Sequence, residues 1–411
     1  MSISQIINRK NATLLAFAGL FFGLFYSRVV LSNAMILLAV VALLNRNFFQ
    51  DFKHFLKRKE LLLISGLFLI YAVSGIYSEN QELFLTRLRV KIPFAFLPLV
   101  FVTLPKIEKP YLLGILGVFV LFNLSGMVYP LYSYFSDPEL YNQLYRQGQV
   151  IPTPINHIRF SILLSIAHFV AAWLAYQYYC SSKTKWALTF VIAAILIFAF
   201  LHLLSVRSGL LGLYIAWLFV IIYVFRKKWK YQIAALLIIT VAVFTALQLS
   251  PTLKGKWNYM RYDLEKMFQG DQHTGYSDSG RIISILSGIE AGKKSPMIGV
   301  GMGDVKSAVI EVYDAKYPYI EEGERHTPHN QFVYIFTGLG LLGLLYFCLS
   351  IFVPVFQDYN YRFALFGVIQ VIFLSSFMTE ATLEGQIGTG AYLFFTLFCI
   401  KYKTALQEKG D

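Results

Sequence analysis

A pair of histidines beside an apolar run is the feature of this sequence best suited to chemistry. The segment Arg-His-Thr-Pro-His-Asn at residues 325–330 directly precedes a long apolar run. An imidazole titrates near ambient pH, so His329 is a candidate general base and His326 a candidate helper, with Asn330 as a substrate contact. Pro328 would fit the first turn of the following helix. Alternatively, the histidine and the asparagine only supply partners for the first N–H groups of that helix.

Two arginines could act with His329 on a phosphorylated substrate. Arg207 lies in Ser-Val-Arg-Ser-Gly at the start of an apolar run, and Arg281 lies in Ser-Gly-Arg at the start of a predicted helix. A guanidinium stays charged and binds phosphate oxygens bidentately, and a helix N-terminus beside Arg281 would add favourable dipole charge. This set suits a reaction whose leaving group is a lipid pyrophosphate. The alternative is that each arginine only reaches a lipid headgroup.

Three basic residues, Arg87, Arg89 and Lys91, alternate in a predicted loop on the same side of the membrane. Their spacing at i, i+2 and i+4 does not put all three on one helix face. We hypothesise that some of them bind the same pyrophosphate or guide a lipid headgroup. The alternative is a loop that simply tolerates positive charge.

Further polar residues are candidates at the ends of other apolar runs. Glu380 and Glu384, spaced at i and i+4, could share a helix face and hold an acceptor sugar, or they could be solvated loop acids. The same kind of alternatives applies to two residues at the start of another apolar run, His157 and Arg159.

No metal or cofactor is expected. The spacing of His326 and His329 is wrong for two metal ligands one helical turn apart, no third ligand is obvious, and the cysteines form no CxxC motif or Cys/His cluster. The glycine-rich stretch at residues 299–303 lacks the preceding strand and the Lys-Ser/Thr of a nucleotide-binding loop. We therefore predict a turn there.

Composition indicates which elements position these residues. The chain has 411 residues, of which 57% are hydrophobic and 14% charged. Soluble domains average about 45–50% apolar and about 25% charged residues, and a membrane helix needs about 20 apolar residues. We predict an all-α polytopic membrane protein with about twelve transmembrane helices. The apolar runs lie at approximately 12–26, 29–44, 61–77, 92–104, 111–134, 158–180, 186–204, 209–225, 231–249, 331–353, 361–378 and 386–402.

Charge placement orients these helices. Nineteen basic residues lie in the predicted inner segments and seven in the short outer loops, so the net charge of +13 reflects membrane topology and does not indicate a nucleic-acid partner. Both termini are predicted to be cytoplasmic and the candidate site to face outward. Predicted domain boundaries are residues 1–250 for helices 1–9, 251–330 for a mostly helical outer loop, and 331–411 for helices 10–12 with a cytoplasmic tail.

Two helices are predicted inside the outer loop. The first spans about 280–291 and the second about 304–315, with the glycine-rich turn between them. Helical spacing puts four apolar residues of the first helix on one face. They are Ile282, Ile285, Leu286 and Ile289.

The motifs, in this order, resemble the O-antigen ligase and O-antigen polymerase superfamily of bacterial envelope enzymes. Each motif is weak alone, but their order and spacing are fairly specific, and at motif level they cover about residues 200–350. They are Ser-x-Arg-Ser-Gly at 205–209, Ser-Gly-Arg at 279–281, Ser-Pro-Met-Ile-Gly-Val-Gly-Met-Gly at 295–303, and His-Thr-Pro-His-Asn at 326–330, before a run with Gly338, Gly340 and Gly343.

The resemblance implies a metal-independent, inverting glycosyltransferase of the GT-C class in the bacterial inner membrane. Its donor would be a glycan on undecaprenyl pyrophosphate, and its acceptor a sugar hydroxyl of lipid A–core in a ligase or another glycan in a polymerase. By this resemblance His329 would be the base, and Arg207 and Arg281 would hold the pyrophosphate. A twelve-span transporter is the alternative class, but the single large outer insertion argues against two matching halves.

Overall fold

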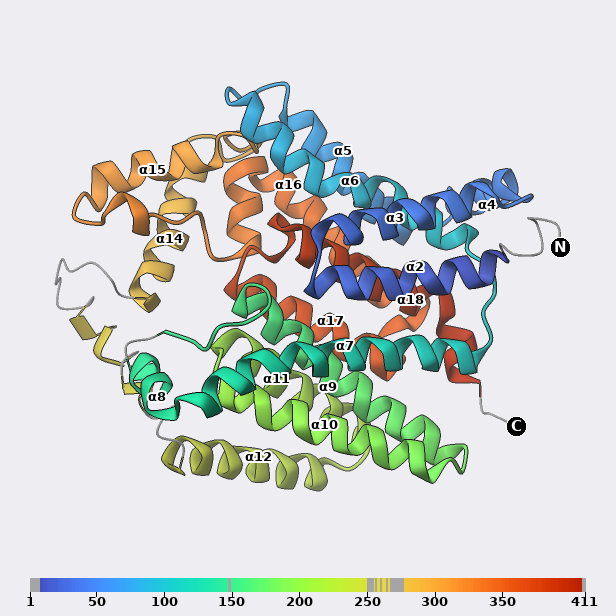
Figure 1. Ribbon diagram of the computed structural model, residues 1–411. Coiled ribbons are helices and arrows are strands. Elements are labelled where there is room, and N and C mark those ends of the chain that lie inside the picture. The colour runs from blue at the N-terminus through green and yellow to red at the C-terminus, as the bar shows by residue number, and fades with distance from the viewer. Residues whose placement is uncertain are drawn as a thin grey trace.

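The computed structural model describes residues 8–146, 149–249 and 277–408, with short pieces between residues 255 and 266. Every regular element in these residues is a helix (Figure 1), which confirms the predicted all-α class. The first half contains α2 (Arg9–Phe25), α3 (Arg28–Leu43), α4 (Phe48–Phe55), α5 (Lys59–Ser74), α6 (Gln81–Thr103), α7 (Lys109–Ser136), α8 (Pro138–Arg146) and α9 (His157–Cys180). The second contains α10 (Thr184–Leu204), α11 (Arg207–Val224), α12 (Trp229–Leu249), α14 (Ser277–Gly292), α15 (Val305–Lys316), η1 (Glu322–Glu324), α16 (Gln331–Phe356), η2 (Gln357–Arg362), α17 (Ala364–Thr379), η3 (Thr382–Glu384) and α18 (Gln386–Gln407).

Each predicted apolar run coincides with a helix, but only some of these helices have the length and apolar composition of a membrane span. In the described part of the chain, five helices are long and apolar enough to cross a membrane: α7, α9, α10, α11, and α16 extended through η2. A sixth would arise if α3 and α4, which bend by 110° at their junction, formed one broken span. The structure thus supports a helical membrane protein, while the count of twelve spans remains a prediction.

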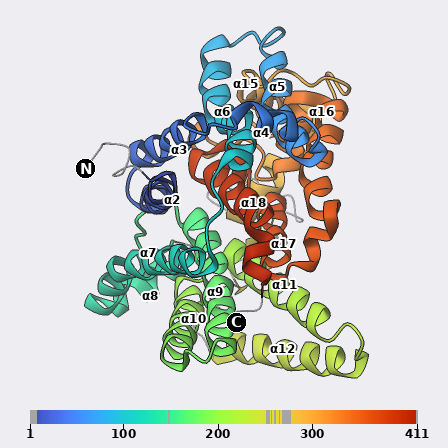
Figure 2. The same ribbon diagram turned by 90° about the vertical axis from the view of Figure 1, so that its right-hand side faces the viewer.

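Helix α18 is the central element of the bundle. Figures 1 and 2 show α2, α3, α5 and α6 on one side of α18 and α7, α9, α10, α11 and α12 on the other, with α17 alongside it. Its phenylalanines are fully buried, and the ring of Phe394 lies 5.1 Å from that of Phe17 and 4.8 Å from that of Phe21. This aromatic packing holds α18 against α2, and the candidate site lies next to the start of α18.

Helix α16 is broken at Gly340, where φ is +65° and ψ is −166°. A broken helix leaves backbone groups without partners, which is costly away from water. Four backbone hydrogen bonds of 2.8–3.2 Å join residues 296–301 to residues 337–342 and supply those partners. The glycine-rich segment is therefore a turn, as predicted, and its structural role is to complete the broken helix.

The two helices predicted in the outer loop are present as α14 and α15, and the buried face of α14 is not the one that carries the four apolar residues. Leu286 is 45% exposed, and the buried face is the neighbouring one, which carries small residues. It consists of Ile283, Ser284, Ser287, Gly288 and Ala291. A Cβ at Gly288 would lie 2.2 Å from Pro328, so α14 approaches the start of α16 closer than large side chains allow. The first part of the predicted loop, residues 251–276, lies mostly outside the described residues.

Candidate active site

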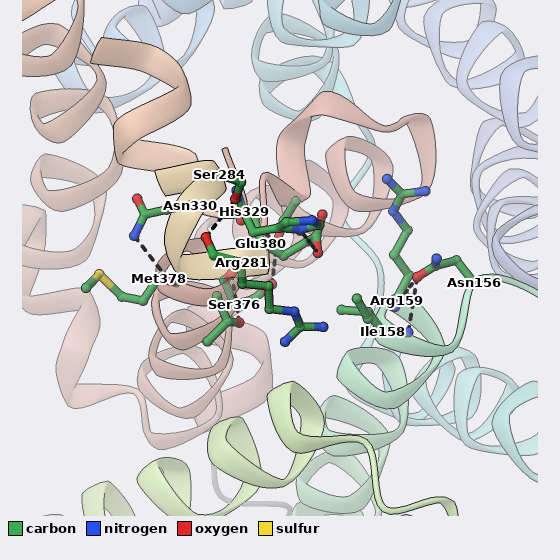
Figure 3. Close-up of polar contacts among 12 residues, drawn as sticks. Asn156, Ile158, Arg159, Arg281, Ser284, His329, Asn330, Ser376, Met378 and Glu380 are labelled. Carbon is green, nitrogen blue, oxygen red and sulfur yellow. Dashed lines mark hydrogen bonds and ion pairs between the residues drawn. The ribbon is translucent and has the colours of Figure 1, made fainter. Parts of the chain in front are cut away.

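His329, the candidate base, is hydrogen-bonded to Glu380 (Figure 3). Its Nδ1 lies 3.1 Å from Oε2 of Glu380, which directly follows α17. The backbone N–H of His329 donates to Oγ of Ser284 on α14 at 3.2 Å. Three elements that are distant in sequence, α14, the segment before α16, and the end of α17, therefore meet at this pair.

The helix after His329 begins later than predicted. It starts at Gln331, so Pro328 lies outside its first turn. Asn330 is the N-cap: its Oδ1 accepts from the N–H of Val333 at 3.1 Å, and its Nδ2 donates to the carbonyl of Met378 at 3.1 Å. Asparagine caps satisfy otherwise unpaired N–H groups, so the capping interpretation applies to Asn330.

The surroundings favour the ionised form of Glu380. Burial raises the pKa of Glu380, but the hydrogen bond and charge of His329 and the charges of Arg281 and Arg159 outweigh burial and lower it from 4.5. A carboxylate only accepts hydrogen bonds, so we infer that Nδ1 of His329 carries the hydrogen and Nε2 the lone pair. The His329 side chain is 21% exposed, and its Nε2 has no hydrogen-bond partner among the described residues. This nitrogen is available to a substrate hydroxyl.

His326 lies beside His329 with its ring nearly perpendicular, and the ring centroids are 5.3 Å apart. Burial lowers the pKa of His326, and the charges of His329 and Arg281 lower it further, whereas Glu324 and Glu380 act in the opposite direction. The net effect favours a neutral imidazole next to the candidate base.

Arg281 and Arg159 approach the His329–Glu380 pair from different sides (Figure 3). Arg281 lies near the start of α14, and Arg159 lies two residues after His157, which begins α9. Asn156 caps α9, and its side chain accepts from the N–H of Arg159 at 3.4 Å. A Cβ at Gly385 would lie 2.5 Å from the guanidinium of Arg159, so this glycine gives the arginine room beside the loop that carries Glu380.

Arg207 begins α11, and Gly209 in the same turn lies directly against α9. The charges acting on Glu380 include those of Arg281 and Arg159.

A second polar cluster lies next to the first and is more deeply buried. Lys91 on α6 is 2% exposed, and its Nζ donates to Oε1 of Glu384 at 2.9 Å. The same oxygen accepts from the hydroxyl of Tyr71 at 2.7 Å and from Nε2 of Gln331 at 2.9 Å. The Oε1 of Gln331 accepts from the N–H of Leu383 at 2.7 Å. Burial raises the pKa of Glu384, but Lys91, Tyr71 and Gln331 outweigh it, so its pKa is lowered from 4.5.

The structure separates residues that the sequence grouped. Lys91 forms the buried ion pair, Arg87 lies over the ring of Tyr334 at 5.8 Å, and Arg89 lines a groove on another face of α6. The three therefore do not form a single anion site. Glu380 and Glu384 do not share a helix face, because Glu380 is extended after α17 and Glu384 ends the 3-10 helix η3.

Sequence reasoning did not find three residues that hold these clusters together. Tyr71 and Gln331 bind Glu384, and Ser284 binds the backbone of His329. The available signal was weak: Tyr71 stands inside an apolar run, and Gln331 directly follows the His-x-x-His-Asn motif. Polar residues in such positions need partners.

The arrangement combines the candidate base, a carboxylate hydrogen-bonded to it and flanking arginines at one end of the helix bundle. In the described ranges no group of three or more His, Cys, Asp or Glu side chains is placed to hold a metal ion. The residues present can accept a proton at Nε2 of His329 and stabilise negative charge through Arg281 and Arg159. This chemistry suits the transfer of a group from an anionic leaving group to a hydroxyl.

Comparison with known proteins agrees with the motifs. Residues 191–348 match the family model described as O-antigen ligase, and this range includes Arg207, Arg281 and His329. Among curated proteins none matches the chain. Residues 191–348 are therefore similar to the O-antigen ligase family, in agreement with the superfamily that the motifs resemble.

Proposed function

We propose that this protein transfers a glycan from undecaprenyl pyrophosphate to a sugar hydroxyl of lipid A–core at the outer face of the bacterial inner membrane. The observation that carries the proposal is the His329–Glu380 hydrogen bond of 3.1 Å, with Arg281 beside it. The O-antigen ligase domain supports the substrate class.

In the proposed reaction, Nε2 of His329 accepts the proton of the acceptor hydroxyl. The acceptor oxygen then bonds to the anomeric carbon of the glycan, and the bond from that carbon to the pyrophosphate oxygen breaks. Arg281, with Arg207 as a further candidate, stabilises the charge that builds on the departing pyrophosphate. Glu380 keeps the His329 ring oriented and stabilises the imidazolium that forms.

Replacing His329 tests this function. We expect His329→Ala to insert and fold normally but to lose transfer of glycan to core by about 10²–10⁴-fold, as when a general base is removed. The measurement is transfer from a purified lipid-linked glycan, with the variant's thermal unfolding as the control for folding. Normal transfer in that variant would exclude His329 as the base.

The glycan pattern of a deletion strain distinguishes ligase from polymerase. A ligase leaves core without any long glycan while lipid-linked polymer accumulates. Core that carries one repeat unit would instead indicate a polymerase, the other activity within the superfamily.

A further inference from the structure

A groove lies on the face of α6 that carries Arg89. It has a volume of about 350 Å³ and runs between α3 and α6 to the start of α18. Its lining includes Met35 and Ile36 of α3, Ile92 and Phe96 of α6, and Gln386 of α18. Ile36 and Ile92 are 57% and 46% exposed, so an apolar chain can reach the groove from outside the protein.

The lining of the groove also carries a positive charge. Arg89 lines the groove, and Nε2 of Gln386 donates to Oγ of Ser32 at 2.6 Å and to the carbonyl of Arg28 at 3.4 Å. Gln386 directly follows Gly385, where a Cβ would lie 2.5 Å from the guanidinium of Arg159. The lining of the groove therefore reaches the loop that carries Glu380, beside Arg159.

Arg159 carries a hydrogen-bond donor that the described residues do not use. The buried Nε–H of Arg159 has no hydrogen-bond partner in the described part of the chain, and a buried donor without a partner is costly. An arginine at the membrane surface is favourable when it meets a lipid phosphate. An apolar groove lined by Arg89, with Arg159 near Gln386, is complementary to a lipid that has acyl chains and a phosphorylated headgroup.

The position of the groove indicates which substrate it would hold. An inverting displacement requires the attacking hydroxyl and the leaving group to lie on opposite faces of the anomeric carbon. Arg281 and Arg159 approach the His329–Glu380 pair from different sides (Figure 3). If Arg281 holds the leaving pyrophosphate, the attacking substrate arrives from the side of Arg159, which lies against Gly385, the residue before Gln386 of the groove.

We propose that the α3–α6 groove binds the lipid anchor of the acceptor, a phosphorylated and acylated glycolipid, with Arg89 contacting its phosphate. This inference rests on the proposed function, because it assigns Arg281 to the donor. It also explains why Arg89 stands apart from Arg87 and Lys91, which lie on other faces of α6.

The test compares lipid binding and transfer in the full-length protein. Arg89→Gln is expected to weaken binding of lipid A about fivefold, the effect of about one surface charge on a lipid phosphate, and to raise the KM for the acceptor by a similar factor. Ile36→Trp fills the groove and is expected to weaken lipid A binding also. Binding is measured by native mass spectrometry with added lipid A, undecaprenyl pyrophosphate or phosphatidylcholine.

Matched controls separate the groove from general effects. Arg46→Gln removes an exposed arginine elsewhere, and Ile76→Trp adds a tryptophan at a residue that is 85% exposed outside the groove. Both are expected to bind lipid A normally. Unchanged lipid A binding in Arg89→Gln and Ile36→Trp would overturn the inference, as would selective loss of undecaprenyl pyrophosphate or an equal loss of phosphatidylcholine.

The binding measurement needs no turnover, so the two proposals can fail separately. If lipid A binding depends on Arg89 but the protein has no transferase activity, the groove proposal stands and the proposed function is wrong. If glycan transfer depends on His329 but lipid A binding does not depend on Arg89, the proposed function stands and the groove proposal is wrong.

Discussion

At the level of single residues, the role of Glu380 changes most. From the sequence it was either a helix-face ligand for an acceptor sugar or a solvated loop acid, but the structure puts its carboxylate 3.1 Å from Nδ1 of His329. A carboxylate in that place fixes the tautomer of the imidazole and stabilises its protonated form. Glu380 is therefore better described as the residue that positions the candidate base.

Glu380→Gln tests this positioning role. The amide can donate to Nδ1 and thereby favour the tautomer with hydrogen on Nε2, which cannot accept a proton. We expect kcat to fall about 10²–10⁴-fold, with little change in thermal stability. Transfer kinetics of the purified variant provide the measurement, and a rate near that of the wild type would show that Glu380 does not act through His329.

At the level of elements, a buried ion pair connects four parts of the bundle. Lys91 on α6 and Glu384 in η3 are 2% and 6% exposed, and Glu384 also binds Tyr71 on α5 and Gln331 at the start of α16. These contacts fix the loop between α17 and α18, and that loop carries Glu380. The second cluster thus supports the geometry of the first.

A single substitution at the ion pair measures the stability lost when one charge is left unpaired. A double substitution measures the net contribution of the intact pair to stability. Lys91→Met leaves a buried carboxylate unpaired, so we expect a loss of about 3–5 kcal/mol in the free energy of unfolding. Lys91→Met combined with Glu384→Leu removes both charges and should recover most of that loss. Thermal unfolding in nanodiscs measures both effects, and equal losses in the single and double variants would contradict this account.

The break in α16 is the second feature at this scale. At Gly340, φ and ψ lie in a region that is open to glycine alone, and a Cβ would lie 2.3 Å from the backbone of Met297. Gly340→Ala is expected to lower the free energy of unfolding by at least about 2 kcal/mol. Gly114→Ala is the matched control, because nothing lies within 4 Å of a Cβ at that helical residue. The control should be neutral or stabilising by about 1 kcal/mol, and equal effects at both glycines would argue against a strained break.

For the whole molecule, the buried acids and His326 predict sensitivity to acid. The pKa of His326 is lowered from 6.5 by burial, and those of Glu380 and Glu384 are lowered from 4.5 by their partners. In each case the unfolded chain binds protons more readily than the folded one, so stability falls as the pH decreases through these values. We expect a modest fall in the unfolding temperature below pH 6.5 and a steeper one below pH 4.5.

Glu384→Gln provides the control for this pH dependence. The variant should be less stable at neutral pH, and its unfolding temperature should fall less steeply below pH 4.5 than that of the wild type. An unchanged slope would mean that other groups dominate acid unfolding.

The sequence alone predicted the helical class, the two helices α14 and α15, and the superfamily. These follow from the length of apolar runs and from the order of short motifs, which are local properties of the chain. The buried face of α14 could not be predicted in this way, because close packing against α16 selects small residues over the more apolar neighbouring face.

Tertiary structure alone decided which polar groups become partners. Glu380 is 51 residues from His329, and Glu384 is 293 residues from Lys91, so neither pairing leaves a local pattern. Likewise, the alternating spacing of three basic residues did not predict their three different environments. Arg87 lies over an aromatic ring, Arg89 lines the groove, and Lys91 forms the buried ion pair. The physical reason is that residue type determines what a side chain needs, whereas the packing of distant helices determines what it meets.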